Sequence, residues 1–321
     1  MLNLKTTVLA LAVTILLACA ASAAAATRYD VRFGIGDQNV QMFDDANYED
    51  LELRQVRYFI PWNAMSDRDE RLKARRWVQA ARKSGARPFL HLSTDDLREK
   101  RADLPSVSAY RKNVNRLVRY FRKLGVRDFG AWNEANHKSQ PTWDEPERAA
   151  RYWKELRRAV AKTCSLRRCR AVGLDVLDQR GVERYVDRFV KAAGRSYVRR
   201  YLRIVGIHNY SDVNRKRTRG LRSIIDTVRD HKRDAKFWLT ETGGVVKFGR
   251  SFPCHETRAA NRLKFLFSVA KNYRRYLQRV YLYNWYGGGC DIRFDAGLVE
   301  ADGTPRKGLA AVERGLRRFK R

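Results

Sequence analysis

The sequence predicts a single-domain α/β fold, the (β/α)8 TIM barrel, and three observations support this prediction. Eight apolar, β-rich runs start roughly every 25 to 43 residues, the length of a strand, a helix and two loops. Most runs are continuously apolar, as is typical of parallel strands that helices cover. No linker rich in Pro, Gly or Ser divides residues 27–321. The runs cover residues 31–36, 56–62, 88–92, 129–132, 171–177, 202–208, 237–240 and 280–285.

The segments between these runs are expected to form amphipathic helices. In residues 106–125, apolar side chains recur at steps of three and four residues, which is the spacing of one helix face. Asp144, three residues before Glu147, predicts a capping box for a helix over residues 145–163. The dipeptide Thr304-Pro305 predicts the start of a last helix over residues 306–319.

A doubly wound open sheet is the alternative fold. It would carry a glycine-rich phosphate loop after the first strand, whereas Gly34-Ile35-Gly36-Asp37 does not continue to a third glycine. The barrel is therefore favoured.

Residues 1–26 have the features of a secretory signal peptide. Lys5 precedes an apolar run over residues 7–20, and alanines follow up to residue 26. We therefore expect a secreted protein whose single folded domain covers residues 27–321. The alternative is lipoprotein anchoring through Cys19, because Leu16-Leu17-Ala18-Cys19 resembles a lipobox. No later run reaches the ~18 apolar residues of a transmembrane segment.

Four cysteines remain after the signal peptide, and they allow three disulfide pairings. In an oxidising compartment such an even set is typical of disulfides. We favour Cys164–Cys169, which closes a small loop, and Cys254–Cys290, which joins the loops after two late strands. The alternative, a zinc site, lacks the paired spacing and neighbouring histidines that such sites usually have.

The chain is strongly basic. Its formal net charge is +32, and arginine supplies 49 of the 67 basic residues, spread over every predicted helix. One interpretation is attraction to a polyanion, such as an acidic glycan or an anionic cell wall polymer. The other is a solvated helix exterior without a partner. No nucleic-acid-binding motif is present, so no specific nucleic acid is expected.

Two glutamates stand where apolar runs end. Glu134 follows Trp132-Asn133, and Glu241 follows Leu239-Thr240. In a closed barrel the carboxyl ends of the strands meet at one rim, where active sites are built. Two carboxylates ~5 Å apart would hydrolyse a glycosidic bond with retention, whereas a gap of ~6.5–9.5 Å would admit a water and give inversion. The alternative is a pair of loop residues in a charge-rich protein.

These motifs resemble glycoside hydrolases of clan A, the retaining (β/α)8 enzymes that include families 5 and 39. The likeness covers residues 29 to 319. It implies that Glu134 is the acid/base and Glu241 the nucleophile, and that Asn133 of the Asn-Glu pair contacts the sugar. Further matches are Arg57 on the second strand, His208 and Tyr210 of a His-x-Tyr pair on the sixth, and Trp285 as a sugar platform on the eighth.

The roles have physical reasons of their own. A guanidinium from Arg57 would keep Glu241 ionised, and Tyr210 would donate a hydrogen bond to it. Burial and the charge of Glu241 would raise the pKa of Glu134, so that it arrives protonated. The alternatives are a structural ion pair for Arg57, a core histidine for His208 and core packing for Trp285.

Weaker candidates lie at the same rim. His91 ends the third run, and Asp37 and Asn39 follow the first, where they would bind a sugar. The remaining candidates are Asp175, Asp178, Trp62 and Trp143.

Together these features predict a secreted, monomeric, retaining glycoside hydrolase that cleaves β-glycosidic bonds without a cofactor or metal. Its substrate is expected to be a poly- or oligosaccharide, and the positive charge favours an acidic glycan. The alternative function is a non-catalytic barrel that binds a glycan or an anionic cell wall polymer.

Overall fold

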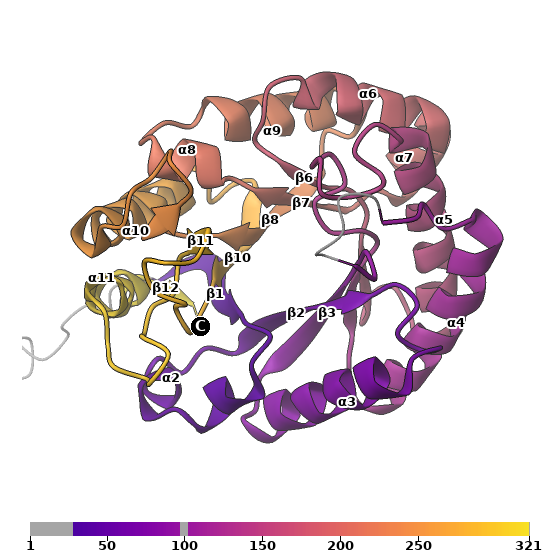
Figure 1. The fold of residues 1–321 in the computed structure, drawn as a ribbon. Helices are drawn as coiled ribbons and strands as arrows, with labels where there is room; N and C mark the ends of the chain where they lie inside the picture. Colours follow the sequence, from indigo (N-terminus) through magenta and orange to yellow (C-terminus); the bar gives the residue numbers. More distant parts are fainter. Residues whose placement is uncertain (1–27, 97–101, 321) are drawn as a thin grey trace, which may run out of the picture.

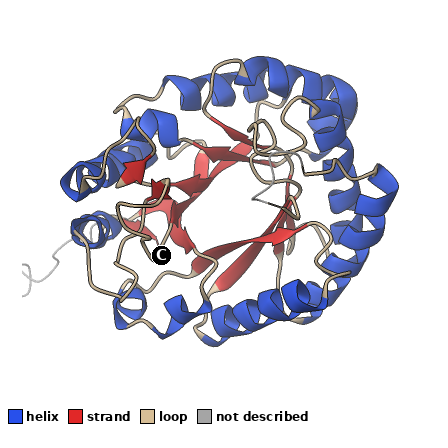
Figure 2. Cartoon of the chain, in the orientation of Figure 1, coloured by secondary structure: helices blue, strands red, loops and turns tan. Residues whose placement is uncertain are grey.

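Parallel strands form a barrel that a ring of helices surrounds, as the sequence predicted (Figures 1 and 2). The computed structural model describes residues 28–96 and 102–320. Each of the eight predicted runs supplies a barrel strand. The barrel strands are β1 (Tyr29–Gly36), β2 (Gln55–Pro61), β3 (Arg87–Ser93), β4 (Asp128–Gly130), β5 (Arg170–Val172), β6 (Asp175–Leu177), β7 (Ile204–His208), β8 (Lys236–Thr242) and β10 (Leu277–Tyr283).

The fifth barrel strand is split into two pieces. β5 pairs with β4, β6 pairs with β7, and the chain between them closes the barrel. Two short additions lie outside this ring. β12 (Phe319–Lys320) pairs with β1, and β9 (Lys247–Phe248) pairs with β11 (Phe294–Asp295) in a small antiparallel sheet.

The helices lie outside the strands, so that each strand is buried on both faces (Figure 1). This explains why the runs are continuously apolar. The helices are η1 (Val40–Asp44), α2 (Ala46–Asp50), α3 (Arg68–Lys83), α4 (Val107–Lys123), α5 (Pro146–Thr163), α6 (Val182–Ala193), α7 (Arg195–Tyr201), α8 (Tyr210–Asn214), α9 (Arg219–His231), α10 (Glu256–Asn272) and α11 (Lys307–Leu316).

Two predicted helices start within one residue of the expected positions, but their starts are built differently from the prediction. No side-chain cap closes the start of α5, because Asp144 and Glu147 both bind Arg188 of α6 instead. The last helix begins at Lys307, after Pro305 has paired with Val299, and it ends before the chain turns into β12. In both cases a tertiary contact replaces the local one.

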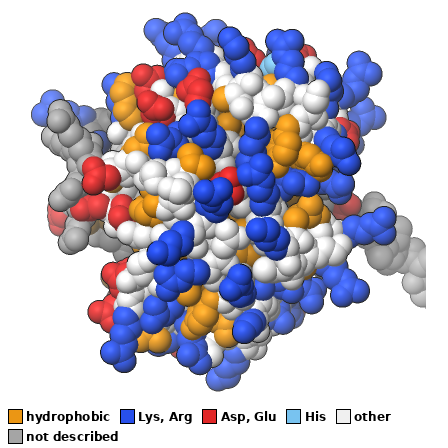
Figure 3. Space-filling view, turned by 90° about the vertical axis from the view of Figure 1, so that its right-hand side faces the viewer, with side chains coloured by type: hydrophobic (Ala, Val, Ile, Leu, Met, Phe, Trp, Pro, Cys, Tyr) orange, Lys and Arg blue, Asp and Glu red, His pale blue; other side chains and the backbone are white. Residues whose placement is uncertain are grey.

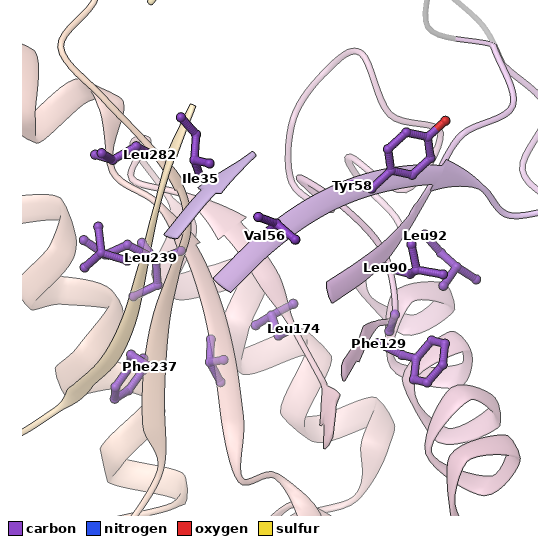
Figure 4. Close-up of a cluster of buried hydrophobic side chains, with 14 of the residues drawn as sticks. Ile35, Val56, Tyr58, Leu90, Leu92, Phe129, Leu174, Phe237, Leu239 and Leu282 are labelled. Carbon is purple, nitrogen blue, oxygen red and sulfur yellow. The ribbon is translucent and has the colours of Figure 1, made fainter. Parts of the chain in front are cut away.

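The apolar core has two layers. Side chains such as Ile35, Leu90 and Leu239 point from the strands towards the helices (Figure 4). Alternate positions, such as Phe89 and Trp238, form a separate cluster inside the barrel. This inner cluster fills the lower barrel, which leaves the carboxyl ends of the strands for polar side chains.

The two favoured disulfides are present. Cys164–Cys169 and Cys254–Cys290 have S–S distances of 2.01 and 1.93 Å. The predicted signal peptide and the alternative lipid anchor at Cys19 lie outside the described residues. Within the described part of the chain, every helix is too short or too polar to cross a membrane.

Candidate active site

Glu134 and Glu241 meet at the carboxyl end of the barrel. One carboxylate oxygen of each, together with a ring nitrogen of His208, lies within 4.8 Å of the others. Their side chains are 20% and 11% exposed, so both carboxylates reach the surface. The predicted convergence of the two strand ends is therefore present.

Local irregularities of the backbone aim both glutamates inward. In β8 the register with β7 shifts by one residue, so that His208 pairs with Glu241 rather than with Thr240. Such a bulge turns a side chain that would otherwise follow Leu239 towards the helices. Glu134 lies in a turn after β4 with a φ of 49°, a left-handed conformation that is rare and strained for a non-glycine residue.

Arg57 connects the two glutamate-bearing segments. From β2, it donates one hydrogen bond to Glu241 (2.7 Å) and another to the Asn133 Oδ1 atom (2.5 Å). Tyr210 donates a further hydrogen bond to the second oxygen of Glu241 (3.2 Å). Both predicted contacts of Glu241 are therefore present.

His208 lies between Glu134 and Asp175. Its Nδ1 atom is 3.0 Å from the Glu134 carboxylate, and its Nε2 atom is 3.1 Å from an Asp175 oxygen. The imidazole is fully buried. A ring that faces a carboxylate on both sides is held in one orientation and favours carrying both of its protons.

The charges of this group reverse one expectation. Burial alone would lower the pKa of His208, but Asp175 and Glu241 outweigh it and raise the pKa to about 10. Burial would also raise the pKa of Glu134, yet the hydrogen bond and charge of His208 prevail and lower it. The prediction that Glu134 has a raised pKa is therefore wrong, because its nearest charged partner is a cation.

Asp175, at the start of β6, supports the whole group. It accepts hydrogen bonds from the Glu134 amide (3.0 Å) and from the Thr240 hydroxyl, besides its ion pair with His208. Burial would raise the pKa of Asp175, but the two neighbouring histidines, with Arg57, lower it. The sequence offered it only as a weak candidate, because its partners come from three other strands.

Two residues expected to bind sugar have structural roles instead. The Trp285 side chain is 0% exposed and donates a hydrogen bond to Asp45 (2.9 Å), so no ring face is open for stacking. Asp37 is buried and accepts the Trp285 and Tyr286 amides at 2.8 and 3.1 Å. The structure supports the core alternative for Trp285, and Asp37 joins the loops after β1 and β10.

His91 is also fully buried, so it does not reach a sugar. Its Nδ1 atom lies 3.3 Å from the Arg57 Nη2 atom. Burial, helped by the nearby cations, lowers its pKa to about 3, so the neutral ring accepts a hydrogen bond from Arg57.

The remaining weak candidates are scattered. Asp178 is buried, which raises its pKa to about 7, and it accepts the Ser211 and Asp212 amides at the start of α8. Asn39 caps η1. Trp62 is half-buried, while Trp143 is 48% exposed and keeps a ring face open.

Glu134, His208 and Glu241 are also the one group among the described residues whose ligand atoms converge as in a metal site. A metal there would have to displace the proton that His208 holds up to a pKa of about 10. It would also face the guanidinium of Arg57, which already binds Glu241. A cation there would therefore compete with two positive groups that already bind these carboxylates.

Comparisons with known proteins find similar folds but no similar sequence. No protein-family model and no curated protein matches the sequence. Solved structures do match. A glucosidase from Croceicoccus marinus has a TM-score of 0.65 and 14% identity, over 90% of this chain and 66% of that one. A family 39 glycoside hydrolase from Bacteroides cellulosilyticus WH2 has a TM-score of 0.62 and 14% identity, over 91% and 64%.

A xylanase from Paenibacillus barcinonensis has a TM-score of 0.62 and 11% identity, over 91% of this chain and 99% of that one. The chain spans about two thirds of the glucosidase and of the family 39 enzyme. At 11–14% identity, these likenesses confirm the (β/α)8 fold and its similarity to clan A barrels.

Proposed function

We propose that this protein is a secreted glycoside hydrolase that cleaves β-glycosidic bonds with retention, with Glu241 as nucleophile and Glu134 as acid/base. The main support is the approach of the two carboxylates to within 4.8 Å at the rim of the barrel. This approach of two oxygens favours the ~5 Å spacing of the carboxyl groups in retaining enzymes over the ~6.5–9.5 Å spacing that admits a water in inverting ones. The fold shared with a glucosidase and a xylanase supports the same reaction class.

In the first step, a Glu241 oxygen attacks the anomeric carbon and the bond to the leaving oxygen breaks, while Glu134 gives that oxygen a proton. In the second, Glu134 takes a proton from water, which attacks the same carbon and releases Glu241. Arg57 and Tyr210 hold the Glu241 carboxylate in place. The free Nδ2 group of Asn133 is available to the sugar, because its oxygen already accepts from Arg57.

The proton for the leaving group comes from the Glu134–His208 pair. In the resting protein it lies on His208, which donates to the Glu134 oxygen 3.0 Å away. When the leaving oxygen approaches Glu134, the proton passes along this hydrogen bond and Asp175 keeps the imidazole in place. The pair then acts as one acid with a shared proton.

The test is hydrolysis of aryl and alkyl β-glucosides, β-xylosides and uronides, and of the corresponding polysaccharides. Wild type should release sugar from at least one of them. Glu241→Ala and Glu134→Ala should each lower kcat by at least a thousandfold, with folding unchanged by thermal unfolding. Glu313→Ala, an exposed glutamate on α11, is the matched control and should act as wild type.

Azide then separates the two roles. Added azide should form the α-glycosyl azide with Glu241→Ala and the β-glycosyl azide with Glu134→Ala, because it replaces the nucleophile in one and the activated water in the other. If wild type binds a glycan but hydrolyses none, and Glu241→Ala binds it equally well, the barrel is a binding protein and the proposal fails. Secretion is tested by sequencing the amino terminus of the exported protein.

A further inference from the structure

A basic pocket lies at the end of the barrel opposite the glutamates. It has a volume of about 390 Å³, lies where α10, α11 and β12 meet, and has no acidic residue in its lining. Buried aromatic rings such as Phe267 and Phe319 form its base. Its cations are Lys264, Lys271, Arg314, Arg317 and Arg318.

These five cations are exposed, and none forms an ion pair within residues 28–96 and 102–320. Like charges gathered without counter-charges repel one another, and an anionic ligand relieves that repulsion. Five cations around one pocket suit several negative charges rather than one. The ligand that best balances these cations is an anion of high charge density.

Further cations continue from the pocket along the same end of the barrel. Exposed arginines stand just before three barrel strands, with Arg274 and Arg275 before β10, Arg54 before β2 and Arg127 before β4. In the barrel, β1 separates β10 from β2, and β3 separates β2 from β4. Arg54 also lies beside the start of β3, because the Arg87 amide donates to the Arg54 carbonyl. Arg127 lies beside the start of β5 in the same way, because the Arg170 amide donates to the Arg127 carbonyl. We call the pocket and these arginines the basic floor.

Acidic residues are scarce on this end. In the described loops that lead from a helix into a strand, only Glu52 and Asp234 are acidic, and Asp234 pairs with Lys232. Figure 3, a side view with α4 and α5 towards the viewer, shows lysine and arginine over the helices and most visible acidic side chains in the left half. Arg122, beside the floor, has its pKa lowered by burial and then by Arg127 and Arg87.

We propose that the basic floor binds a linear polymer of phosphate groups, whose end occupies the pocket. The arc of arginines extends beyond one small ligand, so a polymer fits better than a monomer. Guanidinium forks bind phosphate oxygens in pairs, which accounts for arginine at these positions rather than lysine. The bound polymer would leave the mouth of the barrel free, because the floor lies at the other end of the strands.

Two other partners fit less well. Insertion into a lipid surface needs exposed apolar side chains. The large exposed ones in the described residues are Trp143, Phe248 and Ile292, which lie in β9 and in connections that follow barrel strands at the mouth. Single-stranded nucleic acid needs exposed aromatic rings on which bases stack. On the floor, the half-buried Tyr29 ring lies beneath Arg274 instead.

The experiment measures binding of the full-length chain to long-chain inorganic polyphosphate at several salt concentrations. The pocket variant carries Arg314→Glu, Arg317→Glu and Arg318→Glu. The matched control carries Arg111→Glu, Lys112→Glu and Arg119→Glu, which change the net charge equally on the exposed side of α4. Thermal unfolding and far-ultraviolet circular dichroism check that each variant is folded.

The pocket variant should lose at least tenfold in affinity and show a smaller salt dependence, while the control loses less than threefold. Arg314→Lys with Arg317→Lys should fall between wild type and the pocket variant, because the charge stays and the fork is lost. If the pocket variant does not fold, single substitutions Arg314→Glu and Arg317→Glu should each weaken binding about threefold.

An equal loss in the control would mean that net charge alone drives binding, which overturns the proposal. Binding of polyglutamate as tightly as polyphosphate would overturn the assignment of phosphate. Tighter binding of a single-stranded oligonucleotide or of anionic vesicles would assign the floor to that partner instead. None of these outcomes depends on hydrolysis at Glu134 and Glu241, so the two proposals stand or fall separately.

Discussion

Replacing Asp175 with asparagine is expected to move the pH range of activity, because it removes the charge that keeps His208 protonated. The Asp175 oxygen lies 3.1 Å from the His208 Nε2 atom. At an effective dielectric constant of about 20, two unit charges at that distance attract by roughly 5 kcal/mol. One pKa unit corresponds to about 1.4 kcal/mol, so the pKa of His208 should fall by roughly four units.

The His208 pKa is about 10 in the wild type and should be near ~6 in Asp175→Asn. In the proposed mechanism, the basic limb of kcat/KM reports loss of the proton that the Glu134–His208 pair shares. That limb should therefore move from about pH 10 towards pH 6. The assay is a kcat/KM profile with an alkyl glycoside, whose poor leaving group needs the proton.

Asp178→Asn is the matched control. It is another buried aspartate near the rim, but it bonds to the amides at the start of α8 and not to His208. Its basic limb should stay where the wild-type limb is. If Asp175→Asn folds and keeps its basic limb within half a pH unit of wild type, the proton is not held by this pair and the reasoning fails.

Three further predictions concern the site, the buried ion pairs of Asp128 and the disulfides. Arg57→Lys keeps the charge but loses the fork that reaches Glu241, so kcat/KM should fall roughly 10- to 100-fold. Asp128→Asn leaves buried arginines without their counter-ion and should lower the free energy of unfolding by about 3–5 kcal/mol in a urea titration. Joint replacement of Cys254 and Cys290 by serine opens a loop of 36 residues and should cost roughly 4 kcal/mol by the same titration.

Controls accompany these three changes. Arg148→Lys, on the outer helix α5, should leave kcat/KM as it is, and an equal loss there would contradict the role of the fork. Asp144→Asn breaks only an exposed ion pair and should cost less than about 1 kcal/mol. Serine at Cys164 and Cys169 opens a separation of only 5 residues and should cost roughly 2 kcal/mol, so a larger loss would refute the loop-length argument.

Acid should weaken the ion pairs of Asp128 over a defined pH range. Burial would raise the pKa of Asp128, but Arg279 and Arg87 prevail and lower it to about 2. A depressed pKa adds stability that is complete above the unfolded value of about 4 and is lost as the pH falls through about 2. The wild type should lose roughly 2 kcal/mol more than Asp128→Asn between pH 4 and pH 2. Equal losses would show that Asp128 is not the titrating group.

Local sequence patterns predicted much of this fold. The eight apolar runs predicted every barrel strand, because a strand buried on both faces must be apolar along its length. The spacing of Val114, Leu117 and Phe121 predicted α4, which starts at its Ser106 cap. The predicted cap of α5 is absent, because Arg188, distant in the sequence, binds both Asp144 and Glu147.

The sequence predicted several residues of the site, but not how their charges distribute the protons. The meeting of Glu134 and Glu241 follows from strand ends that a barrel brings to one rim, whereas Arg57 and Tyr210 were expected from the resemblance to clan A enzymes. The expectation that Trp285 forms a sugar platform is wrong. The sequence pattern of an aromatic residue after a strand is the same whether its ring faces a sugar or the core. Its burial depends on Asp45, 240 positions away.

By itself the sequence determined the strand order and the glutamates at the rim, because these follow from hydrophobic periodicity and chain topology. Only the tertiary structure decided how protons and charges are distributed. The proton near Glu134 depends on His208 and Asp175, which reach it from β7 and β6. A pKa is the sum of charges close in space, so no local stretch of sequence contains it.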